Sequence, residues 1–270
     1  MKLTGTASSD VGLVREKNED SFYFDNSLGL FLVADGMGGH VAGEVASGLV
    51  ADTIRDYITH FADKPPDEPG RYDFSDDEQS PLANTILQAI HQANQVVYTT
   101  AQNDKNLYNM GSTVVLIMIE GEADLLVAHV GDSRAFRLRQ GELTRLTLDH
   151  KLAEDPQFEG VINYDSTTVA TLGHTITRAM GIKEEVMPDI QRFPLEDDDF
   201  YLLCSDGLTD MVSEDMITQV LSLDEDIEKK AGHLIELALA GGGKDNVTAA
   251  LAQAQAKGKG ILGGLFKRKG

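Results

Sequence analysis

Residues 113–139 read TVVLIMIEGEADLLVAHVGDSRAFRLR, and this stretch decides the fold class. It contains two apolar runs rich in β-branched residues, 113–119 and 125–130, followed by an alternating segment at 133–139. Runs of this kind are typical of β-strands. The connections between them are too short for the helical crossover that neighbouring parallel strands need. The stretch therefore predicts three strands that pair antiparallel.

Elsewhere, apolar residues recur at the two periods that distinguish helices from strands. Helical spacing over 43–62 and 81–102 predicts two helices with one apolar face each, and 213–241 contains one or two more. Short apolar runs predict further strands at 20–25, 30–34, 200–204 and 247–251. Together these elements predict an α+β fold, with antiparallel sheets and helices packed outside them.

The composition is that of a globular protein with a strong excess of acids. The 270 residues are 41% hydrophobic and 25% charged, and the net charge is −21. This charge argues against nucleic-acid binding, which needs a basic surface, and suits a protein that holds divalent cations. The single cysteine, Cys204, excludes an intramolecular disulfide and a cysteine-based zinc site. It lies in an apolar run, so we expect an inert core thiol.

The chain shows one domain over 1–255 and a basic tail over 256–270. The tail is interpreted as a flexible end, with a tether to an acidic partner or an anionic membrane as the alternative. Residues 63–79 are acidic and form an exposed loop or, less simply, a docking segment, while 150–178 form a polar surface flap. No apolar run has the length of a membrane span, and the N-terminus lacks an apolar signal core. We therefore expect a cytoplasmic protein, and a monomer by default.

A set of aspartates recurs at the edges of apolar strands, beside glycines or other turn residues: Asp20, Asp35, Asp132, Asp206 and Asp245. Turn chemistry explains any one of them, because Asp bonds its own backbone and Gly accepts positive φ. As a set they favour a cation site, since carboxylates gathered at one end of a sheet repel each other unless a cation neutralises them. A carboxylate-rich site without a histidine or cysteine cluster suits Mg²⁺ or Mn²⁺.

Motifs in a fixed order carry a family resemblance over about residues 5–252. They are VGLVREKNEDSF, LFLVADGMGGHVAGEVAS, GSTVV, AHVGDSRAFRL, LTLDH, LLCSDGLTDMV and GGKDNVTAAL. In this order they resemble the metal-dependent Ser/Thr protein phosphatases of the PPM, or type 2C-like, family, and most closely its bacterial members. The resemblance implies a sandwich of two antiparallel β-sheets flanked by α-helices.

The resemblance also implies a role for individual residues of these motifs. Two metal ions, Mn²⁺ or Mg²⁺, would be held by four carboxylates and one backbone carbonyl: Asp20, Asp35, Gly36, Asp206 and Asp245. A third, weaker ion would be bound by Asp132 together with Asp206. Arg15 would hold the substrate phosphate through its forked donors. Glu19 would order metal-bound water, and Asn246 would fix the adjacent turn.

The implied activity is hydrolysis of phosphoserine and phosphothreonine in proteins by a metal-bridged hydroxide, opposing a Ser/Thr kinase. Phosphorylated proteins are the implied partners. The alternative is a catalytically silent phosphoprotein-binding module of the same fold, but such a module should have lost acids and every expected carboxylate is present. The net charge opposes a two-metal nuclease. The glycine-rich stretch GMGGHVAGE lacks the Gly-Lys-Ser/Thr signature of a P-loop NTPase.

Two positions depart from the family pattern. Met37 stands where some relatives carry a histidine proposed as general acid. Protonation of the leaving group would then come from a metal-bound water or from His40, which could equally order its loop. In the flap, His174 replaces the usual asparagine, so the substrate preference of relatives does not transfer. Three other histidines lack metal-ligand spacing and are expected to be structural: His129, His150 and His233.

Overall fold

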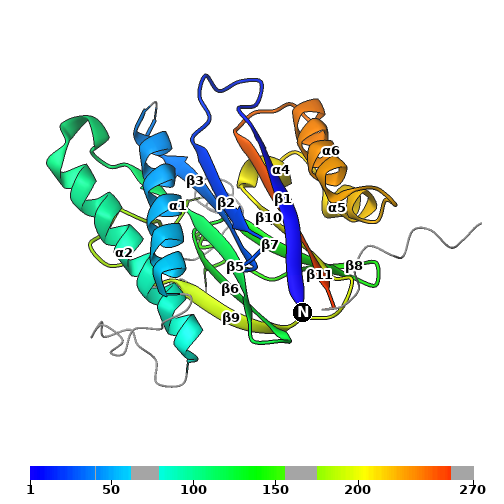
Figure 1. Cartoon of the computed structure of the whole chain (residues 1–270). Coiled ribbons are helices and arrows are strands. Elements are labelled where there is room, and N and C mark those ends of the chain that lie inside the picture. Colours follow the sequence, from blue (N-terminus) through cyan, green and yellow to red (C-terminus); the bar gives the residue numbers. More distant parts are fainter. Residues whose placement is uncertain (40, 62–78, 156–174, 257–270) are drawn as a thin grey trace, which may run out of the picture.

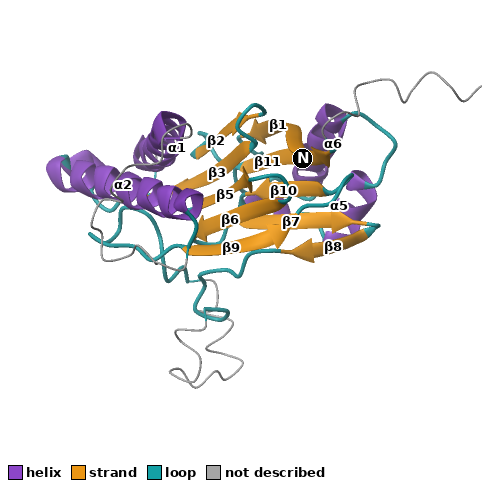
Figure 2. Ribbon diagram, turned by 60° about the horizontal axis from the view of Figure 1, so that its bottom comes forward, coloured by secondary structure: helices purple, strands orange, loops and turns teal. Residues whose placement is uncertain are grey.

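The computed structural model describes residues 1–39, 41–61, 79–155 and 175–256. Two antiparallel sheets lie face to face, and helices cover both outer faces (Figure 1; Figure 2). The predicted sandwich of antiparallel sheets with flanking helices is therefore confirmed. Within the described ranges, no helix combines the length and the apolar character that crossing a membrane would require.

Each sheet has a strand order that differs from the order along the chain. The first sheet has the order β1-β11-β10-β7-β8. Its strands are β1 (Lys2–Asp10), β7 (Arg134–Arg139), β8 (Glu142–Arg145), β10 (Phe200–Cys204) and β11 (Val247–Gln255). The second sheet has the order β2-β3-β5-β6-β9, and β4 pairs with β3. Its strands are β2 (Asp20–Asp25), β3 (Leu30–Met37), β4 (Gly111–Ser112), β5 (Val114–Glu120), β6 (Asp124–Val130) and β9 (Asp189–Pro194).

Helices cover the two sheets separately (Figure 2). The second sheet is covered by α1 (Val41–Phe61) and α2 (Pro81–Asn103), and the short η1 (Lys105–Leu107) follows. The first is covered by α4 (Asp206–Thr209), α5 (Glu214–Leu221) and α6 (Ile227–Ala240). The start of α2 has clear local causes, because Ser80 accepts a hydrogen bond from the Ala83 amide and Pro81 occupies the first turn.

Strand β3 shows why the central strands are continuous apolar runs. Leu30 and Leu32 pack in the cluster beneath α1 and α2. Phe31 and Val33, which point to the opposite face, pack between the two sheets with residues such as Tyr201. Both faces of the strand are therefore buried, and alternation of apolar and polar residues is absent.

The pairing predicted for 113–139 is right for the first two strands and wrong for the third. Strands β5 and β6 form an antiparallel hairpin. Strand β7 does not pair with β6; it lies in the other sheet, between β10 and β8. Gly131 allows this crossing, because its φ of 102° lies in the left-handed region and a Cβ there would lie 2.6 Å from the Thr113 side chain. A short connection can thus join strands of two different sheets as well as neighbouring strands of one sheet.

The predicted helices at 43–62, 81–102 and 213–241 are confirmed with small shifts of their ends. Four strands were not predicted: β1, β8 and β9, which lie at sheet edges, and the two-residue β4, which pairs with β3. Edge strands are partly exposed, so their sequences need no continuous apolar run. Most of the acidic loop 63–79, of the flap and of the basic tail lies outside the described residues. The domain division at 255 and 256 stays a prediction.

Candidate active site

The predicted aspartates come together at one end of the sandwich. Asp20 starts β2 and lies opposite Asp35 of β3 in the antiparallel register. Asp132 follows β6, Asp206 starts α4 directly after β10, and Asp245 precedes β11. A pocket of about 240 Å³ lies among them. Its lining contains Arg15, Glu19, Asp35, Gly36, Asp132, Asp206, Asp245 and Asn246, together with Met37, Gly38, Gly39, Thr113 and Ile176.

Burial and mutual repulsion raise the pKa values of three of these carboxyl groups. Burial is the largest cause for Asp20, whose pKa rises to about 6 although hydroxyls hydrogen-bond it. The pKa of Asp206 rises to about 7, through burial and then through repulsion by Asp132. Burial, with repulsion by Asp20 and Asp206, raises the pKa of Asp35 well above its ordinary value. Ionised together, these carboxylates would repel one another in a buried site, and a bound cation would relieve that repulsion.

The two carboxylate oxygens of Asp20 have different surroundings. Its Oδ2 accepts hydrogen bonds from Ser205 Oγ at 2.7 Å and Thr248 Oγ1 at 2.6 Å. Its Oδ1 is buried and, while Asp35 is ionised, has no donor among the described residues. A buried charged oxygen without a donor is costly unless a cation binds it. The residues present therefore fit an oxygen-ligated divalent ion such as Mn²⁺ or Mg²⁺.

The glycines of the two Asp-Gly motifs are required for close packing and not for turns. Gly36 lies in β3 and Gly207 in α4, and neither has a positive φ. A Cβ on Gly36 would lie 2.1 Å from the Gly43 carbonyl oxygen. A Cβ on Gly207 would lie 2.0 Å from the Asn246 carbonyl oxygen. The turn explanation of these motifs is therefore wrong for both, and the motifs mark crowded backbone at the pocket.

Asn246 does more than fix the turn at Asp245. Its amide donates to Asp245 Oδ1 at 2.8 Å. Its side-chain Oδ1 accepts from the Glu19 amide at 2.8 Å, and its Nδ2 donates to the carbonyls of Val11 and Lys17 at 2.9 and 2.8 Å. One side chain therefore fastens the loop between β1 and β2 to the start of β11. The loop carries Glu19 and Asp20 into the pocket.

Arg15 lies at the rim of the pocket. Its Nη2 donates to Asp245 Oδ2 at 2.6 Å, and the two side chains are 55% and 39% exposed. This hydrogen bond is the main cause that raises the pKa of Arg15. Its guanidinium is thus anchored beside the carboxylates while part of it still faces solvent. A phosphate group entering the pocket would meet its forked donors.

Asp132 has a partner that sequence reasoning missed. Lys151 donates from Nζ to Asp132 Oδ2 at 2.7 Å, and both side chains are nearly inaccessible to solvent. The adjacent Asp149 is engaged by two guanidinium groups, those of Arg134 and Arg145. No local pattern signalled this pair, because Lys151 and Asp132 are far apart in the sequence and the fold brings them together.

Comparison with known proteins decides the family. The family model for protein phosphatase 2C matches residues 5–236. This chain belongs to the protein phosphatase 2C family. It is 39% identical over 250 residues to the serine/threonine protein phosphatase PstP of Mycobacterium tuberculosis, covering 93% of this chain and 45% of that relative. It is 31% identical over 255 residues to the serine/threonine phosphatase stp of Listeria monocytogenes, covering 93% and 96%.

A solved structure of the protein phosphatase 2C family agrees with this fold. The crystal structure of the catalytic domain of PstP in complex with two manganese ions superposes with a TM-score of 0.74 at 38% identity. The match covers 94% of this chain and 99% of that one. The resemblance to bacterial metal-dependent phosphatases inferred from the motifs is confirmed. This chain spans less than half of the full PstP relative, so it matches only part of that protein.

Spacing in the sequence was a poor guide to what surrounds two buried histidines, His129 and His150. His129, His150 and Asp189 bring three ligand atoms within 4.8 Å of one another, although their spacing in sequence gave no such signal. The contacts nevertheless favour a structural role. His129 Nε2 lies 2.7 Å from the Leu148 carbonyl, and Arg178 donates to Asp189 at 2.8 Å. These contacts satisfy His129 and Asp189 with protein partners.

The remaining predicted residues have varied outcomes. Cys204 is fully buried, and burial raises the pKa of its thiol to about 12, so the inert core thiol is confirmed. His233 is a partly exposed residue beside Glu225. His40 and His174 lie outside the described residues, so their predicted roles stay predictions. The described lining of the acidic pocket contains no histidine.

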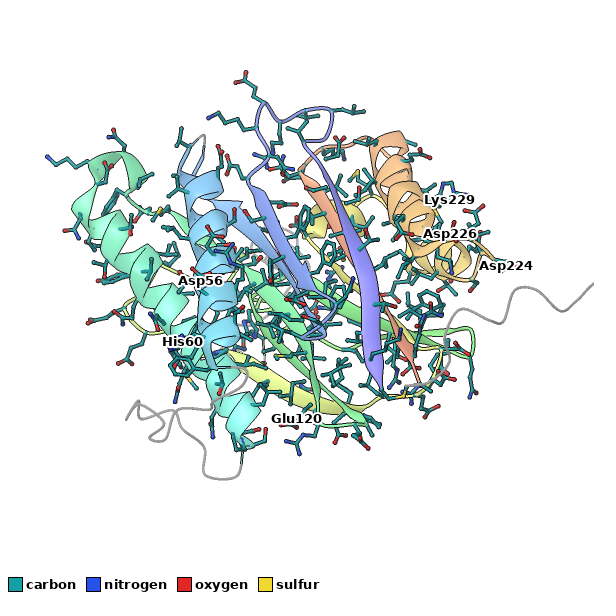
Figure 3. All side chains as sticks on the ribbon, viewed as in Figure 1. Asp56, His60, Glu120, Asp224, Asp226 and Lys229 are labelled. Atoms are coloured by element: carbon teal, nitrogen blue, oxygen red, sulfur yellow. The ribbon has the colours of Figure 1, made fainter. Side chains whose placement is uncertain are left out.

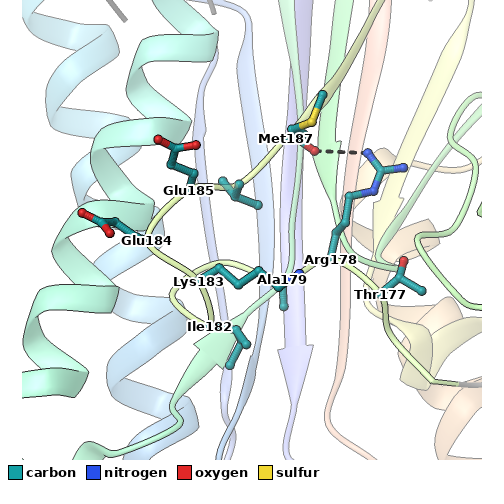
Figure 4. A pocket seen from close by; sticks show the side chains of 9 residues that line it. Thr177, Arg178, Ala179, Ile182, Lys183, Glu184, Glu185 and Met187 are labelled. Carbon is teal, nitrogen blue, oxygen red and sulfur yellow. Dashed lines mark hydrogen bonds between the residues drawn. The ribbon is translucent and has the colours of Figure 1, made fainter. Parts of the chain in front are cut away.

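A larger cavity, of about 550 Å³, is lined by the segment that directly follows Ile176, which is a residue of the acidic pocket (Figure 4). Its lining comes from residues 177–179 and 182–187. At one side Arg178 donates to the Met187 carbonyl at 3.1 Å, and Glu184 and Glu185 project from the other side (Figure 4). It contains none of the aspartates predicted to bind metal. The groups suited to phosphate chemistry therefore lie in the smaller, acidic pocket.

Proposed function

We propose that this chain hydrolyses phosphoserine and phosphothreonine in proteins with the help of two divalent metal ions. The observation that carries the proposal is the convergence of buried carboxylates near Asp20, whose Oδ1 has no donor within the described ranges while Asp35 is ionised. Family membership and the manganese ions in the PstP crystal structure support the same activity. Mg²⁺ is the other ion that this oxygen donor set suits.

The proposed ligands follow from the placement of the residues. The two ions would be held by the carboxylates and one carbonyl of the cluster: Asp20, Asp35, Gly36, Asp206 and Asp245. When bound, such ions act as Lewis acids and make water a nucleophile near neutral pH. Glu19 and Asn246 would keep the metal-bearing loop in place, as their hydrogen bond at 2.8 Å indicates.

Arg15 would bind and orient the substrate phosphate. Its guanidinium is partly exposed at the rim and is anchored by Asp245. Forked donors complement two phosphate oxygens, and the positive charge offsets the negative charge of the phosphate. Protonation of the departing Ser or Thr oxygen by His40 stays a prediction. Its test is the pH profile of His40→Ala, because loss of a general acid would remove the basic limb of that profile.

The partners would be phosphorylated proteins, and the activity would oppose a Ser/Thr kinase. The relatives named as serine/threonine phosphatases support this substrate class. A silent phosphoprotein-binding module is the second candidate, but four of the five aspartates line one pocket and Asp20 lies opposite Asp35, which favours the enzyme. A third metal at Asp132, a cytoplasmic location, a monomeric state and tethering by the basic tail also remain predictions from the sequence.

The experiment is hydrolysis of a phosphothreonine peptide with Mn²⁺ and with EDTA, by the wild type, Asp206→Ala and Asp56→Ala. Asp56 is the matched control, a 71% exposed side chain on the outside of α1 that pairs with Arg55 (Figure 3). We expect turnover that needs metal, survives Asp56→Ala and is lost in Asp206→Ala. A folded, metal-loaded wild type without turnover would contradict the enzyme and favour the binding module.

A further inference from the structure

The ion pair between Lys151 and Asp132 has no part in the reaction proposed above. Nζ of Lys151 lies 2.7 Å from Asp132 Oδ2, and the two side chains are 9% and 3% exposed. Burial of this kind makes the pair sensitive to loss of either partner, because the remaining charge would stay in the interior uncompensated. The lysine is therefore placed to serve as the counter-ion of Asp132.

Two further carboxylates, Asp149 and Asp206, also act on the charge of this lysine. Asp149 is the nearer of them, with Oδ2 3.8 Å from Nζ. It is already paired with Arg134 at 2.7 Å and with Arg145. Two guanidinium groups compensate Asp149, and Asp132 is the carboxylate in direct contact with Nζ, at 2.7 Å, so Asp132 is the main partner of Lys151.

Lys151 also stands where the flap joins the body of the protein. It forms an isolated antiparallel bridge with Ile176, which lines the acidic pocket. The amide of Leu152 donates to Thr175 at 2.9 Å, and the amide of Thr177 donates to His150 at 2.8 Å. These bonds hold the backbone of Lys151 beside the acidic pocket, where its side chain reaches Asp132.

We propose that Lys151 is a built-in cation at Asp132 that weakens divalent binding to this carboxylate. The proposal rests on the proposed function, because it concerns the same metal cluster. A divalent ion bound to Asp132 would share that carboxylate with the ammonium group of Lys151. The ion and the ammonium group would then be close together, and two positive charges repel strongly where water is excluded. The chain should therefore bind two ions tightly and a third only weakly, because the ammonium group of Lys151 already compensates the charge of Asp132.

The test counts Mn²⁺ ions bound to the full chain by calorimetric titration and by the electron paramagnetic resonance signal of free Mn²⁺. The variants are Lys151→Met, which removes the charge, and Lys151→Arg, which keeps it. Lys230→Met is the matched control, a buried lysine that donates to the Leu221 carbonyl away from the pocket. We expect two tight ions in wild type, Lys151→Arg and Lys230→Met, and a third site at least about tenfold tighter in Lys151→Met.

An unchanged third site in folded Lys151→Met would overturn the proposal. If that variant does not fold, Asp132→Asn decides, because the proposal expects this variant to keep both tight ions of the wild type. Loss of a tightly bound ion in Asp132→Asn would overturn it. Failure of the wild type to bind any Mn²⁺ would instead count against the proposed function, so the two failures are distinguishable.

Discussion

Asp20 and Asp35 lie directly opposite each other across the antiparallel strands β2 and β3. The carboxylate of Asp20 also accepts hydrogen bonds from Ser205 and Thr248, which belong to the first sheet or its connections. One carboxylate thus joins the two layers of the sandwich. Its other oxygen, Oδ1, has no donor among the described residues while Asp35 is ionised, so a metal ion bound there would link metal binding to the packing of the two sheets.

This arrangement predicts a characteristic pH dependence for the metal-free protein. Because the folded pKa values of Asp20 and Asp206 are raised to about 6 and 7, the folded state binds more protons than the unfolded state above pH 4. Stability should therefore fall as the pH rises from about 4 to 7, by about 2–3 kcal/mol for Asp20 alone. Urea unfolding of metal-free protein across this range measures the slope.

Asp20→Asn is the variant that isolates this contribution. It should flatten the slope and stabilise the metal-free protein near pH 7, since an uncharged amide replaces a buried charge. It should also remove most of the stabilisation by Mn²⁺, which for the wild type is about 2.7 kcal/mol at a hundred times the Kd. Equal stabilisation of Asp20→Asn and wild type by Mn²⁺ would show that Asp20 is not a ligand.

Arg15 should contribute to phosphate binding and not to metal binding. Arg15→Ala is expected to lower kcat/KM for a phosphothreonine peptide about tenfold to a hundredfold, the loss of a charge-assisted hydrogen bond. Arg15→Lys should recover only part of it, because the forked geometry is absent. Arg55→Ala, which removes an exposed guanidinium on α1, is the control. Unchanged kcat/KM in Arg15→Ala would exclude the role.

The central strands and the candidate site were more predictable from the sequence than the connections were. The buried strand at 30–34 and its Asp-Gly ending were visible because apolar runs and turn dipeptides are local patterns. The assignment of 133–139 to the other sheet was not visible, since it depends on the layer with which the strand packs. Lys151 was missed for the same reason, because its contact with Asp132 is fixed by the fold.

Gly36 should tolerate no side chain. Gly36→Ala would place a Cβ 2.1 Å from the Gly43 carbonyl oxygen and 2.6 Å from the Glu19 carbonyl oxygen. We expect a loss of about 1–3 kcal/mol in the free energy of unfolding, together with weaker Mn²⁺ binding. Gly48→Ala in α1 is the matched control, since nothing lies within 4 Å of its added Cβ. That control should be neutral or stabilising by up to about 1 kcal/mol. Equal stability of the two variants would contradict the crowding.

Asn246 should be needed for the shape of the metal-bearing loop. Asn246→Ala removes the acceptor of the Glu19 amide and the donor to two carbonyls, so a loss of about 2–4 kcal/mol in unfolding free energy is expected. Asn106→Ala, which removes an exposed side-chain hydrogen bond to Asp104, should cost less than about 1 kcal/mol. Thermal unfolding of both variants gives the comparison, and similar losses in the two would argue against a special role for Asn246.

The most direct measurement of the central claim is anomalous diffraction from crystals grown with Mn²⁺. Two strong peaks are predicted in the acidic pocket, in contact with Asp20, Asp35, Asp206 and Asp245. An empty pocket, with manganese bound only at His129, His150 and Asp189 or at no site, would contradict a metal-dependent phosphatase built on these carboxylates.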